Sequence, residues 1–242
     1  MSEEYFKHKF VKPNAIEFRE YQLSLSKDAK NQNSLVVLPT GLGKTTVALQ
    51  VIVDYLEQGK GGVLFLAPTR VLVNQHFEFL KENLLLDDIG IITGEDLLSK
   101  RKKLWVNSII CATPEVARND LQRNIVPTEQ FSLVIFDEAH RAVGDYAYTA
   151  IASHFQENVR FLGMTATLPS EKKKAEEIVK SLRIQSILQK TDESHDVKPY
   201  IQETKTEWVY VDLPLEMKAI QTCLRLALDE RYTQMQKNGL QL

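Results

Sequence analysis

The chain has little cysteine, no long apolar run and no excess of basic charge. Its two cysteines, Cys111 and Cys223, lie too far apart to form a metal-binding motif. Cys111 stands in an apolar run, which predicts a buried and unreactive thiol. No apolar segment approaches the roughly 20 residues of a membrane span, and residues 1–4 lack the basic and apolar regions of a secretory signal. We therefore expect a cytoplasmic protein in a reducing environment, without a membrane partner.

The charge balance argues against a surface that binds nucleic acid by charge alone. Thirty basic and 32 acidic residues give a net charge of −2, whereas such surfaces are usually basic. Any nucleic acid would therefore be held by local groups, namely backbone amides, hydroxyls and a few Lys or Arg. The basic runs at 100–103 and 172–174 are interpreted as solvated faces. Trp105 and Trp208 are interpreted as packing residues rather than platforms for bases.

Short apolar segments alternate with longer amphipathic ones over the first two thirds of the chain. The apolar segments are continuous, which is typical of strands covered on both faces. Strands are predicted at residues 34–38, 63–67, 89–93, 108–112, 133–136 and 160–164. Helices are predicted at 16–29, 44–58, 70–84, 114–123 and 148–156. This order predicts an α/β fold with a mostly parallel sheet, helices on both faces, and ligands outside the carboxyl ends of the strands.

The pattern changes after Leu168. A charged helix is predicted at 171–182, a polar loop at 191–199, a strand at 201–213 and a long helix at 215–237. The last helix carries apolar residues at helical spacing, and no later segment could cover them. We expect one domain over residues 1–190. Residues 191–242 would then begin a second structural unit of a longer protein.

A phosphate-binding loop is predicted between the first strand and the helix that follows it. Gly41 and Gly43 allow the backbone N–H groups to turn toward phosphate oxygens, and the helix N-terminus adds its dipole. Lys44 would reach the β- and γ-phosphates of ATP, and Thr45 would bind Mg²⁺. The first Gly of the strict pattern is replaced by Leu38. The alternative is an ordinary Gly-rich turn. The full set of predicted loop residues is Thr40, Gly41, Leu42, Gly43, Lys44, Thr45 and Thr46.

A second and a third segment follow later strands. Asp137 comes directly after the strand at 133–136, where its carboxylate could hold Mg²⁺. Glu138 is the better candidate to orient the attacking water. His140 has no second residue at metal-ligand spacing, so we interpret it as a coupling residue. Thr165 and Thr167 form a small hydroxyl-bearing turn. Such a turn reports ATP hydrolysis to nucleic acid in one large class of ATPases.

Segments 39–45, 137–140 and 165–167 together resemble motifs I, II and III of superfamily 2 helicases of the DEAH-box type. The resemblance implies a RecA-like domain with Lys44, Asp137 and Glu138 as its catalytic residues. It further implies that Gln22, in the segment 18–22, reads the adenine edge. It also implies sequence-independent contacts with the nucleic-acid backbone. The residues that would make these contacts are Thr69, Arg70, Thr93, Gly94, Thr113 and Pro114.

Segments 140–148 and 196–200 resemble the archaeal Hef helicases and their eukaryotic FANCM and MPH1 relatives, and this likeness extends over nearly the whole chain. It implies an N-terminal RecA-like domain, followed at 191–242 by a linker strand and the first helix of an inserted helical domain. A second RecA-like domain, absent from this sequence, would complete the ATP cleft. The implied function is ATP-dependent movement on forked or branched DNA in an archaeal-type cell.

Two alternatives remain open. An RNA helicase or a double-stranded-RNA-sensing ATPase of the same superfamily shares part of this signature. A P-loop ATPase that serves as a switch or scaffold, without translocation, would need the ATP site alone. Contacts at Thr69, Arg70, Thr93 and Thr113 distinguish these functions, because a switch does not need them.

Overall fold

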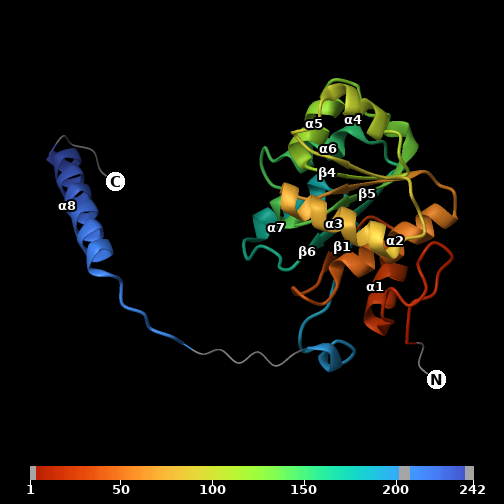
Figure 1. The fold of residues 1–242 in the computed structure, drawn as a ribbon, viewed down its shortest axis with the longest axis horizontal. Coiled ribbons are helices and arrows are strands. Elements are labelled where there is room, and N and C mark those ends of the chain that lie inside the picture. The colour runs from red at the N-terminus through yellow and green to blue at the C-terminus, as the bar shows by residue number, and fades with distance from the viewer. Residues whose placement is uncertain (1–3, 202–207, 238–242) are drawn as a thin grey trace. The chain divides into compact units, whose positions relative to one another are not determined.

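The computed structural model describes residues 4–201 and 208–237, and the chain divides into two units, Met1–Ile201 and Gln202–Leu242. The first unit contains a seven-stranded sheet with helices on both faces (Figure 1). The described residues of the second unit contain one helix, α8 (Leu215–Lys237). None of the described helices is both long enough and apolar enough to span a bilayer.

All seven strands pair in parallel, in the order β3-β4-β2-β5-β6-β1-β7. The six predicted strands are confirmed to within two residues. Strand β7 was not predicted, because it lies at the sheet edge and its residues alternate between half-buried and exposed. The strands are β1 (Ser34–Val37), β2 (Gly62–Leu66), β3 (Ile89–Ile92), β4 (Ile109–Ala112), β5 (Phe131–Phe136), β6 (Arg160–Thr165) and β7 (Ser186–Gln189).

Two apolar clusters, one on each face, hold the helices against the sheet. One cluster contains buried residues of α1, α2 and α3, and the other contains buried residues of α5, α6 and α7 together with Trp105 at the end of α4. Cys111 is fully buried between strands, and burial raises the pKa of its thiol. The helices are α1 (Glu20–Ala29), α2 (Lys44–Glu57), α3 (Arg70–Asn83), α4 (Leu98–Leu104), α5 (Pro114–Gln122), α6 (Ala147–His154) and α7 (Lys172–Ser181).

The predicted helices are confirmed, with two differences. Helix α1 begins at Glu20 rather than at residue 16, because Arg19 has extended backbone angles and Glu17 forms a bridge with Tyr5. Helix α4 was not predicted, because its sequence is a short basic run. The second basic run, 172–174, is exposed on α7, as expected.

A buried carboxylate joins α4 to α5. Asp120 is fully buried and accepts hydrogen bonds from Arg101 Nε at 2.8 Å and from Arg101 Nη2 at 3.0 Å. The indole Nε1 of Trp105 donates to the same carboxylate at 2.9 Å. The packing role of Trp105 is therefore confirmed. Arg101, in contrast, departs from the solvated face predicted for residues 100–103, because its guanidinium has a buried partner.

The segment around residue 200 belongs to the first unit. Val197 is fully buried, and the ring of Tyr200 lies 5.5 Å from that of Tyr21. The strand predicted at 201–213 lies partly outside the described residues. Residues 208–213 are described and form no strand, and Trp208 is 80% exposed there. The packing role predicted for Trp208 is therefore not seen within the described part of the chain.

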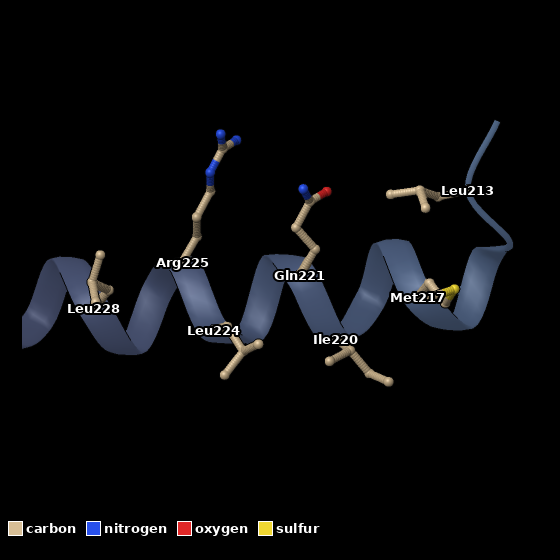
Figure 2. A pocket seen from close by; sticks show the side chains of 7 residues that line it. All are labelled: Leu213, Met217, Ile220, Gln221, Leu224, Arg225 and Leu228. Carbon is tan, nitrogen blue, oxygen red and sulfur yellow. The ribbon is translucent and has the colours of Figure 1, made fainter. Parts of the chain in front are cut away.

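Helix α8 confirms the helix predicted at 215–237. No residue of α8 is buried, and its apolar side chains line a shallow concavity together with Leu213 on the segment that leads into the helix (Figure 2). This concavity contains none of the predicted site residues. Its lining consists of Leu213, Met217, Ile220, Gln221, Leu224, Arg225 and Leu228.

The Asp120 cluster gives a stability prediction. Replacing Asp120 by Ala leaves a guanidinium and an indole N–H without their acceptor, so the free energy of unfolding should fall by about 3 kcal/mol. Urea unfolding followed by circular dichroism measures this. Glu176→Ala removes an exposed partner of Lys172 on α7 and should cost less than about 0.5 kcal/mol. Equal losses in the two variants would contradict the structural role of the buried pair.

Candidate functional site

Every predicted site residue except Gln22 lies at or just beyond the carboxyl end of a strand. The neighbours β3, β4 and β2 lead into the residues predicted to hold nucleic acid. The neighbours β5, β6 and β1 lead into the acids, the hydroxyl turn and the phosphate loop. Backbone hydrogen bonds between neighbouring strands continue to this edge. The amide of Asp137 donates to Leu66 O at 2.9 Å, and that of Leu38 donates to Thr165 O at 3.1 Å. The residues predicted to bind nucleic acid thus lie on one half of the edge, and those predicted to bind ATP lie on the other half.

The loop between β1 and α2 has the backbone geometry of an anion site. Gly41 and Gly43 have φ values of +86° and +80°, which L side chains rarely adopt. Within the described chain, the amides of Gly43, Lys44 and Thr45 donate no hydrogen bond. Free N–H groups at a helix N-terminus attract phosphate oxygens. Thr40 and Gly41 are exposed, Thr45 and Thr46 are half-buried, and Leu42 packs into the core.

Gln22 and Tyr21 hold this loop from α1. Gln22 Nε2 donates to Leu42 O at 3.0 Å, and the hydroxyl of Tyr21 donates to the same carbonyl at 2.8 Å. A Cβ on Gly43 would overlap Gln22 Nε2, so any side chain at this position would have to displace the buried amide group of Gln22. Gln22 Oε1 is buried without a hydrogen-bond partner among the described residues. The contact with adenine stays a prediction, and this oxygen is the acceptor that could make it.

Lys44 extends from the first turn of α2 across the loop. Its Nζ donates to Leu38 O at 3.0 Å. Burial lowers the pKa of Lys44, and the negative charges of Glu138 and Asp137 oppose part of that lowering. The ammonium group therefore lies in the field of both predicted acids.

Asp137 is fixed at three atoms. In addition to its amide, its carbonyl oxygen accepts from the hydroxyl of Tyr148 at 2.7 Å. Its carboxylate Oδ2 lies 2.8 Å from His76 Nε2. Asp137 and His76 are 5% and 7% exposed. Burial raises the pKa of Tyr148 well above its usual value, so this hydroxyl stays protonated and can donate. Tyr148 comes from α6 and His76 from α3, so the residue is held from both faces of the sheet.

Glu138 has left-handed backbone angles, φ 49° and ψ 48°. A non-glycine residue in this conformation costs about 1–3 kcal/mol, and such strain concentrates at functional sites. The turn brings Glu138 Oε2 to 3.2 Å from His140 Nδ1. Glu138 and the sheet edge are therefore joined through His140.

The predicted coupling residues lie in one hydrogen-bonded chain. His140 Nδ1 is 3.0 Å from the hydroxyl of Thr165, and that hydroxyl donates to Thr167 O at 2.9 Å. Because the proton of Thr165 is directed at Thr167, Thr165 Oγ1 accepts from His140, whose Nδ1 must then carry a hydrogen. The structure thus brings Glu138, His140, Thr165 and Thr167 together, while their role in coupling stays a prediction.

The predicted nucleic-acid residues differ in exposure. Thr69 and Arg70 are exposed at the N-terminus of α3, and Gly94 is exposed after β3. Arg70 pairs with Glu95, while the amide and hydroxyl of Thr93 donate to Asp96 Oδ2 at 2.8 and 3.3 Å. Thr113 is 6% exposed and Pro114 is buried at the start of α5. Those last two residues are therefore buried, unlike Thr69, Arg70 and Gly94.

Comparison with known proteins decides the family. The model of the DEAD/DEAH box helicase family matches residues 19–175, well over half of the chain. The chain belongs to the DEAD/DEAH box helicase family. The matched residues include the phosphate loop, the acids and the hydroxyl turn, so use of ATP follows from membership in this family.

Individual relatives show which helicases within the family this chain resembles. A Methanocaldococcus jannaschii protein named as an ATP-dependent RNA helicase is 38% identical over 239 residues, which cover 98% of this chain and 31% of that protein. The ATP-dependent DNA helicase MPH1 of Saccharomyces cerevisiae is 36% identical over 228 residues, covering 90% and 23%. The crystal structure of the Pyrococcus furiosus Hef helicase domain matches with a TM-score of 0.78 and 38% identity, covering 96% and 50%.

These relatives confirm the Hef-like and MPH1-like assignment and the RecA-like helicase fold. The chain spans less than a third of the two longer relatives and half of the Hef helicase domain. Three residues that contact the predicted site were not predicted from the sequence: Tyr21, His76 and Tyr148. Tyr21 and Tyr148 stand within segments already singled out, but His76 has no signal in its surroundings.

The two glycines of the phosphate loop form a matched pair for a test. Gly41→Ala places a side chain at positive φ in open space, so it should cost about 1 kcal/mol of stability from strain alone. Gly43→Ala adds the clash with Gln22 and should cost about 1–3 kcal/mol more. Thermal unfolding and the affinity for a fluorescent ATP analogue measure both effects. A Gly43→Ala variant as stable as Gly41→Ala would refute the close packing of Gln22 beneath the loop.

Proposed function

We propose that this chain is the ATP-binding half of a helicase or translocase that moves on forked or branched DNA. The observation that carries the proposal is the division of a single sheet edge. Free amides, a half-buried lysine and two acids lie on one half, and exposed threonine and arginine groups lie on the other. The names of the MPH1 relative and the Hef structure support action on DNA.

The residues present fit a nucleoside triphosphate and Mg²⁺. The unpaired amides of α2 would receive phosphate oxygens, and Lys44 would exchange its bond with Leu38 O for the β- and γ-phosphates. Thr45 and Asp137 would hold the ion, since Asp137 Oδ1 forms no hydrogen bond with any described residue. Bound Mg²⁺ would neutralise charge that develops on the transferred phosphoryl group.

Glu138 would orient the attacking water. Its strained backbone and its contact with His140 fix its carboxylate at this edge of the sheet, where its charge acts on the pKa of Lys44. A change at Glu138 during the reaction would pass to Thr165 and Thr167 through His140, because these groups share hydrogen bonds. We propose this chain of contacts as the coupling between hydrolysis and the hold on the strand.

The nucleic-acid contacts would be local and independent of sequence. Thr69, Arg70, Thr93 and Gly94 would hold backbone phosphates, with Thr113 and Pro114 supporting the neighbouring turn. Acidic partners occupy Arg70 and Thr93 in this structure, so binding would exchange Glu95 and Asp96 for phosphate oxygens. In such an exchange the guanidinium of Arg70 stays paired with an oxygen anion, first that of Glu95 and then that of a phosphate.

A second RecA-like domain would complete the ATP cleft. Support comes from the Hef helicase domain, half of which is matched by this chain. That second domain would supply an arginine finger, a residue that raises the rate of hydrolysis by about 10³- to 10⁵-fold in related ATPases. ATP would close the two domains on the strand.

The RNA alternative has one specific observation in its favour, namely the name of the M. jannaschii relative. Binding of labelled fork, single-stranded DNA and RNA across a salt series decides between the two. We expect the fork to bind best, with affinity falling as salt rises. Tighter binding of RNA would favour the RNA helicase. Absence of salt-sensitive binding, in a longer protein with the second domain, would favour a switch.

The same experiment tests the contact at Arg70. Arg70→Ala should lower the affinity for all three nucleic acids about equally. It should also reduce the slope of the logarithm of the binding constant against the logarithm of the salt concentration by about 1, because one phosphate contact is lost. Lys173→Ala, in the exposed basic run of α7, is the matched control and should leave the slope unchanged. A slope that changes only in the control would contradict the proposed surface.

The chain by itself should bind ATP but hydrolyse it slowly, without unwinding, because it lacks the second wall of the cleft. Phosphate release in the presence and absence of forked DNA measures this. Glu138→Gln should keep nucleotide affinity within about twofold and abolish the residual hydrolysis, since only orientation of the water is lost. Strong stimulation of the wild-type chain by DNA would contradict the need for a second domain.

A further inference from the structure

His76 lies on the same helix as two of the proposed nucleic-acid residues. Helix α3 begins after Thr69, whose hydroxyl accepts from the amide of Leu72 at 3.3 Å. Arg70 is exposed in the first turn, and His76 is buried in the second. The helix therefore extends from the proposed nucleic-acid surface to the carboxylate of Asp137.

The contact between His76 and Asp137 is enclosed and short. Their side chains are 9% and 7% exposed, and Nε2 lies 2.8 Å from Oδ2. An ionised carboxylate can only accept hydrogen bonds, so Nε2 is the donor. The imidazole also packs against Phe65 of β2, with ring centroids 4.4 Å apart. Phe65 is buried, so the ring has little freedom to turn away from Asp137.

We propose that His76 is a positioning residue for Asp137. By donating to Oδ2 it fixes the rotation of the carboxylate and leaves Oδ1 for Mg²⁺. This inference rests on the proposed function, because it assumes that Asp137 binds the ion. Groups that donate to a metal-binding carboxylate change metal affinity by about 10- to 100-fold when they are removed.

A consequence follows for the nucleic-acid half of the edge. The hydrogen bond fixes Asp137 to α3, whereas Glu138 is joined through His140 to the turn after β6. A shift of α3 when Thr69 and Arg70 bind phosphate would therefore move the carboxylate of Asp137. His76 would give nucleic acid a direct contact with the Mg²⁺ site that does not pass through Thr165.

The test compares His76→Leu, which keeps apolar volume without a donor, with His76→Gln, which keeps an N–H donor. The measurement is the Mg²⁺ concentration at half-maximal binding of a fluorescent ATP analogue to the 242-residue chain. His76→Leu should raise this midpoint on the order of 10-fold. His76→Gln should recover most of the loss, and binding without Mg²⁺ should be similar in all variants. His154→Leu, on the exposed end of α6, is the matched control.

The outcomes separate this inference from the proposed function. If the wild-type chain does not bind the analogue, the proposed ATP site fails; if it binds with no dependence on Mg²⁺, the proposed Mg²⁺ site at Asp137 fails, and in either case the role of His76 fails with it. If the wild type depends on Mg²⁺ but His76→Leu has the same midpoint, only the role of His76 is overturned. A lower melting temperature with an unchanged midpoint would assign His76 a purely structural role.

A measurement on the unaltered protein covers the case in which His76→Leu does not fold. Two-bond ¹H–¹⁵N spectra of the histidine rings distinguish the tautomers, and the signal of His76 is identified by its loss in His76→Gln. The hydrogen bond requires a hydrogen on Nε2. Addition of Mg²⁺ and the analogue should shift this signal. A His76 ring with hydrogen on Nδ1 alone would overturn the inference, and so would a His76 signal that does not shift when Mg²⁺ and the analogue are added.

Discussion

The site depends on the parallel pairing of the sheet. Parallel strands all present their carboxyl ends at one edge, so segments far apart in the chain, such as those after Val37 and Thr165, follow strands that end side by side. Hydrogen bonds to a carbonyl of the adjacent strand hold the ends of the strands in register. The donors are the amides of Leu38, Ala67, Asp137 and Thr113. A slip of one residue in any strand would turn the first side chain after it to the opposite face.

A chain without an excess of basic residues can still bind phosphate at this edge, because a few groups at the right positions suffice and many positive charges are not needed. Helix N-termini and free amides provide positive potential that the formal charge does not count. The one lysine of the ATP site is half-buried, and burial lowers its pKa while the neighbouring acids counteract the effect. On the other half of the edge, Glu95 and Asp96 neutralise Arg70 and engage Thr93. The net charge of −2 therefore does not conflict with a nucleic-acid surface.

Much of the fold could be predicted because buried parallel strands leave continuous apolar runs. Strand β7 could not, since an edge strand with Ile187 46% exposed has a weak apolar signal. Helix α4 was missed because its basic run indicates a solvated face, while the buried partner of Arg101 lies 19 residues away. The loop and acids were predictable from local spacing. His76 was not, because its partner Asp137 is 61 residues away and only the packing of α3 on the sheet brings them together.

The two adjacent acids are held by different neighbours of β5, and this bears on how the site can respond. Asp137 is joined to α3, which follows β2, and Glu138 is joined through His140 to the turn after β6. Strands β2 and β6 flank β5 on its two sides. The left-handed backbone at Glu138 gives the two side chains separate directions despite their adjacency. Movement on the side of β2 would thus act first on Asp137, and movement on the side of β6 would act first on Glu138. Under the proposed function, a signal through α3 would reach Asp137 and a signal through Thr165 would reach Glu138.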